Sequence, residues 1–209
     1  MAGMTPSVFI VDDDISVRES VELMVEHAGW RPEVFASAQE FLSRSPAACP
    51  CCLVLDMGLP DLNGLELQKR IGAERAEMPI IFITGRGDIP MTVRAMKAGA
   101  VEFLTKPFSP EALLDAIRSA VERSRVFLEQ RASLQLLRDR HQALSRREVE
   151  VMARVVRGQL NKQVAGELGI SEITVKAHRG RVMRKMHARS LPELVNIAAR
   201  LGLHIDDQV

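Results

Sequence analysis

Polar side chains stand at the ends of successive apolar runs in the N-terminal half of the chain. Asp12 and Asp13 follow the first run, and Asp56 ends a later one. Thr84 ends the next run, and Lys106 comes just after the last. If these runs are parallel strands, their carboxyl ends meet at one rim, where such a fold gathers its chemistry. The five side chains are therefore predicted to form one cluster.

This set of side chains suits a site for a divalent cation and a phosphoryl group. Three neighbouring carboxylates do not all ionise readily without a cation. A small number of hard oxygen ligands favours Mg²⁺ (or Mn²⁺), with phosphate oxygens as further ligands. Lys106 would supply a fixed positive charge and Thr84 a hydroxyl donor. The central carboxylate, Asp56, would be the nucleophile that forms an acyl phosphate.

The apolar runs alternate with amphipathic helical patterns, which predicts five βα units in succession. Such an alternation indicates an α/β fold, with a five-stranded, parallel, doubly wound sheet covered by helices on both faces. The runs 53–55 and 80–83 are apolar throughout, as in strands buried on both faces. The predicted strands cover 8–11, 33–35, 52–56, 80–84 and 100–104, and helices are expected to begin near residues 16, 37, 64, 90 and 109.

The alternation stops after Ile117. From there to about Leu144 the chain has no Pro or Gly, and apolar residues stand among Arg, Glu and Gln. This pattern favours a long helix that continues past the first domain as a connector, with a solvated linker as the alternative. The remaining chain has helical patterns and no strand signal, so an all-α, four-helix domain is expected. Its helices are predicted to follow Ser145 and to cover about 162–168, 172–186 and 191–201.

The third of these helices is basic on one side. Residues 169–176 read as a turn that feeds a capped helix, which is the arrangement of a helix-turn-helix recognition helix. Lys176, Arg181 and Arg184 fall on the outer face, and no acidic residue follows Glu172 in this helix. Basic side chains there can neutralise phosphates, and Lys or Arg can also read guanine. The pattern favours DNA binding over a merely solvated face.

The composition is that of a globular protein with differently charged halves. Hydrophobic residues make up 46% and charged residues 26% of the 209, which excludes a disordered chain. Residues 1–143 carry 16 Lys and Arg against 20 Asp and Glu, whereas residues 144–209 carry 12 against 7. The basic part suits a polyanion.

No apolar run reaches the roughly 18 residues of a membrane span, and no signal peptide is recognisable. Only three cysteines occur, which excludes a secreted disulfide framework, so a cytoplasmic protein with no membrane partner is expected.

The N-terminal motifs resemble the receiver domain of two-component response regulators. The matching segments are Val11–Asp14, Leu55–Gly64, Ile83–Gly85 and Lys106–Phe108, and residues 84–91 are similar to the FixJ-like subgroup in particular. The resemblance implies that Asp56 is phosphorylated by a cognate sensor histidine kinase. It implies that Asp12, Asp13 and Asp56 bind Mg²⁺ together with the main-chain carbonyl of Gly58, and that Thr84 and Phe103 switch position.

The C-terminal motifs resemble the LuxR-type DNA-binding domain. The matching segments are Leu144–Val151, Gly158–Ala165, Ile170–Arg179 and Arg184–Met186. The resemblance implies that Asn161 and Lys162 contact backbone phosphate and that Lys176 reads bases. The predicted DNA-binding residues are Asn161, Lys162, Thr174, Lys176, Ala177, His178, Arg179, Gly180, Arg181 and Arg184.

The sequence thus predicts a phosphorylation-dependent transcription regulator and not an enzyme, apart from slow self-dephosphorylation. A receiver is expected at residues 1–122, a helical linker at 123–143 and a helix-turn-helix domain at 144–209. The expected partners are the histidine kinase, promoter DNA, a second copy of the chain on phosphorylation, and RNA polymerase. Two alternatives are a phosphate-independent DNA-binding regulator and a flavodoxin-like cofactor protein, although three Asp after the first strand would repel a flavin phosphate.

Overall fold

The computed structural model describes residues 5–85 and 89–203. The chain divides into two compact units, residues 1–129 and 130–209, each considered by itself below. Three positions of the FixJ-like segment, 86–88, lie outside the described residues, as do the outermost ends of the two expected domains. Among the described residues, no helix is long and apolar enough to cross a membrane.

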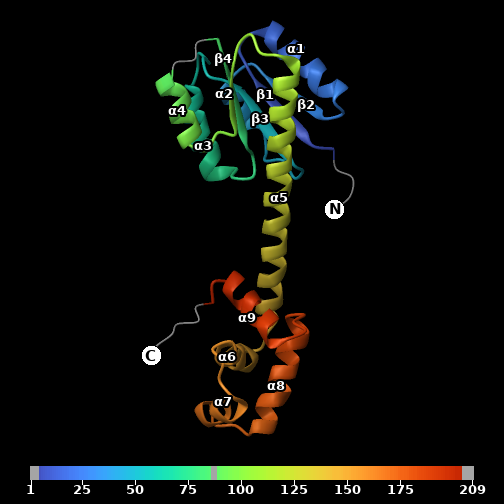
Figure 1. Cartoon of the computed structure of the whole chain (residues 1–209), viewed down its shortest axis with the longest axis vertical. Helices are drawn as coiled ribbons and strands as arrows, with labels where there is room; N and C mark the ends of the chain where they lie inside the picture. Colours follow the sequence, from blue (N-terminus) through green and yellow to red (C-terminus); the bar gives the residue numbers. More distant parts are fainter. Residues whose placement is uncertain (1–4, 86–88, 204–209) are drawn as a thin grey trace. The chain divides into compact units, whose positions relative to one another are not determined.

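The first unit is built around a parallel sheet, part of which is seen in Figure 1. Its strands lie in the order β2-β1-β3-β4-β5. Val11 pairs with Leu55, and Asp56 pairs with Ile83, so the carboxyl ends of the three central strands are level. This register explains why residues far apart in the sequence reach one rim. The strands are β1 (Ser7–Val11), β2 (Arg31–Phe35), β3 (Cys51–Asp56), β4 (Ile80–Thr84) and β5 (Glu102–Thr105).

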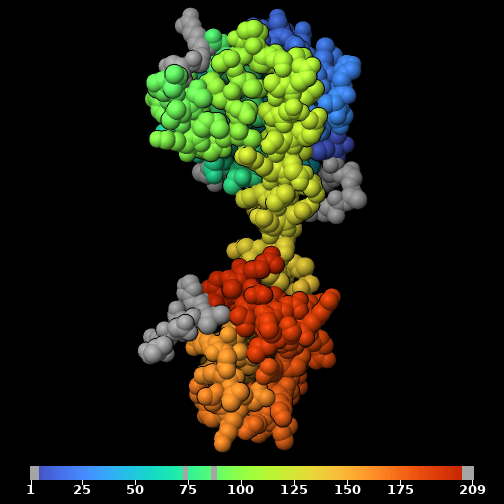
Figure 2. Space-filling model, viewed as in Figure 1, coloured from blue at the N-terminus to red at the C-terminus, as the bar shows by residue number. Residues whose placement is uncertain are grey.

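Helices cover both faces of this sheet, as the doubly wound prediction requires. Alternate strand residues enter two separate cores, because successive side chains of a strand point to opposite faces. One core joins Ile10 and Ile81 to α1 (Ile15–His27) and the start of α5 (Pro110–Gln142). The other core joins Phe9 and Phe82 to the remaining helices of the unit. These helices are α2 (Ala38–Ser43), α3 (Gly64–Glu74) and α4 (Ile89–Lys97), and α4, in green, lies at the surface of the first unit in Figure 2.

Helix α5 extends through the region in which a helical connector was expected. It contains 33 residues, and its early turns bury Leu113 and Ile117 in the first unit. Near its other end, Leu137 is buried in the core of the second unit, and the Ser133 hydroxyl accepts a hydrogen bond from Arg200. The last turns of α5 therefore belong to the packing of the second unit.

The second unit contains the four predicted helices, α6 (Arg146–Val155), α7 (Asn161–Leu168), α8 (Glu172–Lys185) and α9 (Leu191–Arg200). Ser145 and Glu148 form a capping box at the start of α6, each bonding the main chain of the other. Gly169 ends α7 in the left-handed conformation, with φ of 64°, which favours glycine. Helix α8 packs against α6 and α7 and buries Val175 and Val182 between them.

The three cysteines are buried where β3 begins. Cys51 and Cys52 lie in β3 and are fully inaccessible, and Cys49 lies in the preceding loop with its sulfur 3.4 Å from the Ser7 hydroxyl. All three are free thiols. Burial raises the pKa of Cys51 to about 12, so these thiols behave as packing residues rather than as nucleophiles.

Candidate functional site

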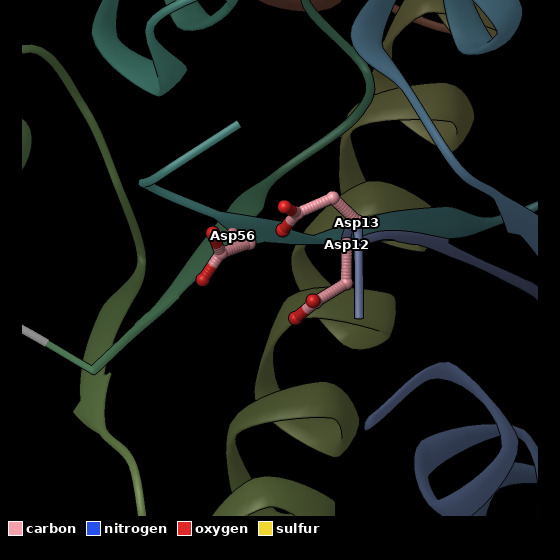
Figure 3. Close-up of side chains that lie close together, drawn as sticks. All are labelled: Asp12, Asp13 and Asp56. Carbon is pink, nitrogen blue, oxygen red and sulfur yellow. The ribbon is translucent and has the colours of Figure 1, made fainter. Parts of the chain in front are cut away.

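Three carboxylates converge at the carboxyl ends of β1 and β3 (Figure 3). One oxygen each of Asp12, Asp13 and Asp56 lies within 4.8 Å of the other two. Asp12 is fully buried and Asp56 is 6% exposed, whereas Asp13 faces solvent. The predicted cluster therefore forms, with one side open to an incoming group.

Lys106 bridges the two buried carboxylates. Its ammonium nitrogen lies 2.6 Å from Oδ2 of Asp12 and 2.9 Å from Oδ1 of Asp56. Burial is the largest single influence on the pKa of Lys106 and lowers it. The hydrogen bonds to Asp12 and Asp56 together outweigh burial, so the pKa lies above its ordinary value. Lys106 is therefore held as a charged ammonium directly beside Asp56.

The raised pKa of Asp12 indicates that the positive charge of Lys106 does not fully balance the carboxylate cluster. Burial is the largest influence on its pKa and raises it, although hydrogen bonds from Lys106 and from the Asp14 main chain act in the opposite direction. One ammonium does not neutralise three carboxylates. A divalent cation would supply the missing charge, and the three carboxylates offer the oxygen ligands that Mg²⁺ prefers. The residues present thus fit a metal site.

The second oxygen of Asp56 is held by main chain. The N–H of Gly58 donates to Oδ2 at 2.8 Å, and a Cβ at position 58 would lie 3.2 Å from this same oxygen. Glycine therefore leaves the Asp56 carboxylate uncrowded on the side facing the loop. Gly58 is exposed, and its hydrogen bond holds its main chain beside the Asp56 carboxylate.

The two residues expected to switch are placed on neighbouring strands. Thr84 is the last residue of β4 and is 4% exposed, and its carbonyl accepts a hydrogen bond from the main chain of Lys106 at 2.7 Å. Phe103 lies in β5 and is half-buried, with its ring 6.4 Å from that of Phe82. Thr84 is thus tied to the cluster through Lys106, and Phe103 packs on the core beside it.

The predicted DNA-binding residues lie on α7 and α8. Asn161 and Arg179 come together across the two helices, with an Arg179 nitrogen 3.3 Å from Oδ1 of Asn161. The Thr174 hydroxyl lies 2.8 Å from that of Ser171, the residue that caps α8. His178 is half-buried, and its Nδ1 has no hydrogen-bond partner within the described residues. The exposed members of the set are Lys162, Lys176, Ala177, Gly180, Arg181 and Arg184.

Two features of α8 were not predicted from the sequence. Lys185 stands beside the basic face in the sequence, but its ammonium nitrogen lies 2.6 Å from Oε2 of the buried Glu148 and 3.0 Å from the Ala143 carbonyl. Ile173, which has the size of a core residue, is 81% exposed. Its spacing from Val175 and Val182 was the available signal, since it falls off their buried stripe.

Two family profiles match the chain. The response regulator receiver domain matches residues 8–118, and the luxR family of bacterial regulatory proteins matches residues 142–198. The first match contains the carboxylate cluster and Lys106, and the second contains α7 and α8.

Relatives cover the chain almost from end to end. Nodulation protein W of Bradyrhizobium diazoefficiens is 49% identical over 196 residues, which cover 94% of this chain and 86% of that protein. Transcriptional regulatory protein FixJ of the same organism is 40% identical over 196 residues, covering 94% and 96%. The solved structure of the response regulator StyR is 46% identical, with a TM-score of 0.85, and covers 94% of this chain and 100% of that one.

Proposed function

Because the chain belongs to the response regulators of two-component systems, with a LuxR-type DNA-binding domain, we propose that a phosphoryl group on Asp56 controls its binding to DNA. As a member of this family it is a phosphorylation-dependent transcription regulator and not an enzyme. The observation that carries the assignment of Asp56 is its environment. One carboxylate oxygen faces the Lys106 ammonium, the other faces the Gly58 N–H, and Asp12 and Asp13 lie alongside.

The phosphoryl transfer follows from these contacts. An oxygen of Asp56 attacks the phosphorus of a phosphohistidine on the sensor kinase; the P–O bond forms as the N–P bond breaks, and the histidine leaves with the electron pair. Mg²⁺, held by Asp12, Asp13, Asp56 and the Gly58 carbonyl, would supply positive charge to the phosphoryl oxygens. Lys106 supplies a second, fixed charge from its position between Asp12 and Asp56. The acyl phosphate is then slowly hydrolysed.

The response is proposed to begin at Thr84 and Phe103. The Thr84 hydroxyl turns toward the new phosphoryl oxygens, and Phe103 moves into the space beside it. This would change the surface formed by α4, β5 and α5. Ile89, Val93 and Met96 of α4 are exposed and follow one another at helical spacing, which supports this face as the contact of a homodimer.

The second unit is proposed to bind the promoter DNA. Lys176 in the early turns of α8 is proposed to enter the major groove, while Asn161 and Lys162 at the start of α7 contact the phosphate backbone. Two copies joined by phosphorylation would match a two-fold promoter site. The bound dimer would then act on RNA polymerase in the cytoplasm, where promoter DNA lies. We propose a receiver at 1–122, a linker at 123–143 and a DNA-binding domain at 144–209, and the border between the two compact units, at residues 129 and 130, falls within this linker.

Acetyl phosphate with MgCl₂ tests the assignment. The full chain should gain the mass of one phosphoryl group, and Asp56→Asn should gain none. Asp14→Asn is the matched control, because Asp14 lies beside the cluster but caps α1 through Ser16, which Asn also does. If Asp56→Asn is phosphorylated to the wild-type yield, Asp56 is not the phosphoacceptor. Equal DNA affinity with and without the phosphoryl group would instead support phosphate-independent regulation.

A further inference from the structure

The outward face of α8 begins with an apolar side chain. Ile173 is 81% exposed, and Ala177, Gly180 and Arg184 follow it four, seven and eleven positions later. These spacings place the four residues in one row along the helix. The row therefore begins with a large apolar side chain, has only the small residues Ala177 and Gly180 at its centre, and ends in a basic side chain.

Packing within the second unit does not account for Ile173. The buried stripe of α8 is formed by Val175 and Val182 and continues into Met186, and Ile173 is not part of this core. A β-branched residue also favours a helix less than Ala, Glu or Lys does. An exposed isoleucine in the first turn of α8 therefore contributes little to the stability of the unit.

Gly180 gives a second, independent sign that something outside the unit approaches this row. A glycine inside a helix costs about 1 kcal/mol relative to alanine. Apart from the adjacent backbone of α8 itself, a Cβ at Gly180 would meet no described atom within 4 Å, so no other part of the described chain requires glycine there. Ala177 next to it is also small and exposed. The centre of the row allows close approach of a large partner.

The charges beside the row identify this partner as DNA. Lys176 and Arg181 are exposed beside the row and Arg184 is exposed at its end, and α8 contains no acidic residue after Glu172. The side chain of Ile173 carries no hydrogen-bond donor, so it cannot donate to a phosphate or to the acceptor edge of a purine. The apolar group that bases present in the major groove is the C5-methyl of thymine.

We propose that Ile173 contacts a thymine methyl group in the major groove and so selects thymine at one position of each half-site. This rests on the proposed docking of α8 in the groove. Lys176, one turn further along α8, reads a neighbouring base, while Ile173 makes the apolar contact from the first turn. Ile173 is thus a specificity-determining residue that acts without a hydrogen bond.

Replacing thymine by deoxyuridine removes this methyl group and nothing else. Binding sites are first selected from random duplex DNA with the phosphorylated full chain, and each thymine of the selected site is then replaced in turn. At one thymine in each half-site, the wild-type protein should lose about fourfold in affinity, corresponding to about 0.8 kcal/mol, the value of one buried methyl or methylene group. Ile173→Ala should bind the thymine and uracil duplexes equally well.

Leu160→Ala is the matched control. Leu160 is also a large apolar residue of this unit and is 70% exposed, but it precedes α7 and lies outside the row. This variant should keep the full loss on uracil substitution. Sites selected by Ile173→Ala should also lose their preference for thymine at that position.

Two results would overturn the inference. One is that no uracil substitution weakens binding by the wild-type chain, and the other is that Ile173→Ala shows the same loss as wild type. In both cases the protein still binds a defined DNA sequence, so the proposed function stands. If selection yields no defined sequence at all, it is the proposed DNA-binding function that fails.

Discussion

The ammonium nitrogen of Lys106 lies 2.9 Å from Oδ1 of Asp56, although the two residues come from different βα units. The sheet brings them together, because the main chain of Lys106 donates to the carbonyl of Thr84 at the end of β4, the neighbour of β3. The Lys106 side chain then needs only to cross one strand. The charge beside the proposed phosphoacceptor is thus fixed by backbone pairing.

Lys106→Ala should still be phosphorylated but should no longer dimerise in response. Acetyl phosphate and Mg²⁺ should still modify the variant, at a lower rate, because the carboxylates remain. Dimerisation on phosphorylation, measured by sedimentation, should be largely lost, since the proposed response passes from the phosphoryl group through Lys106 and Thr84. Without its charged partner the buried Asp12 should also lower the free energy of unfolding by about 1–3 kcal/mol. A variant that dimerises as wild type does would show that Lys106 has no part in the switch.

Asp13→Asn should weaken Mg²⁺ binding in the absence of phosphate. Asp13 is the exposed member of the carboxylate cluster, and its removal leaves two carboxylates facing the Lys106 ammonium. Calorimetric titration with MgCl₂ should show affinity lower by about tenfold or more, equivalent to about 1.4 kcal/mol. Asp14→Asn should leave the affinity unchanged. An unaltered affinity in Asp13→Asn would exclude Asp13 as a ligand.

Acid should destabilise the second unit through Glu148. The hydrogen bond from Lys185, followed by that from the Ser145 main chain, lowers the pKa of Glu148 from 4.5 to about 2. A lowered pKa means that the stabilisation is fully present above about pH 4.5 and is lost as the pH falls toward about 2. Since Lys185 is 39% exposed, solvent screening limits the loss to about 1 kcal/mol. Amide hydrogen exchange in α6 and α8, corrected for intrinsic rates, would measure it.

Glu148→Gln should remove this acid dependence and lower protection at neutral pH to a similar extent. Glu150→Gln is the control, because Glu150 pairs with the more exposed Arg146 and Arg147 and contributes little. A Glu148→Gln protein that keeps the wild-type pH profile would show that another group is responsible.

Lys176→Ala and Lys162→Ala should change DNA binding in different ways, the first by loss of sequence specificity and the second by loss of affinity for all sequences. Loss of a base contact by Lys176 should cost about 1–3 kcal/mol and relax specificity at one position. Loss of a phosphate contact by Lys162 should weaken all sequences alike and reduce the salt slope by about one unit. Affinities for the selected site and for random duplex at a series of salt concentrations separate these outcomes. Should Lys176→Ala lower both affinities equally, Lys176 is a phosphate contact.

The fold was predictable because its signals are local. Continuous apolar runs marked β3 and β4, and Ser145 marked the start of α6. Placing Asp12 and Asp56 at one rim needed only the rule that parallel strands end together. The five βα units and the four later helices were confirmed, with boundaries that shift by one or two residues.

The remaining details depend on long-range packing, which spacing does not reveal. Lys185 follows the basic residue Arg184 in the sequence, but its ammonium pairs with the buried Glu148 of α6, a contact between two helices. Leu137 falls within the expected linker, and its burial with the second unit depends on how the last turns of α5 pack. A pattern of charges shows which side chains could act together, whereas the folded contacts decide which of them remain free for a partner.

The buried cysteines allow local opening of the first unit to be measured by thiol labelling. Cys52 lies in the centre of the sheet and Cys51 at the first position of β3, where its N–H donates to the Ser124 hydroxyl of α5. A thiol reagent reacts only with an exposed thiolate, so labelling of Cys51 and Cys52 requires separation of β3 from its neighbours. The labelling rate of Cys52 in the native chain divided by its rate in the denatured chain then equals the opening equilibrium constant of the strand that carries Asp56. Labelling thus reports whether phosphorylation changes the opening of this strand, and no cysteine has to be introduced for the measurement.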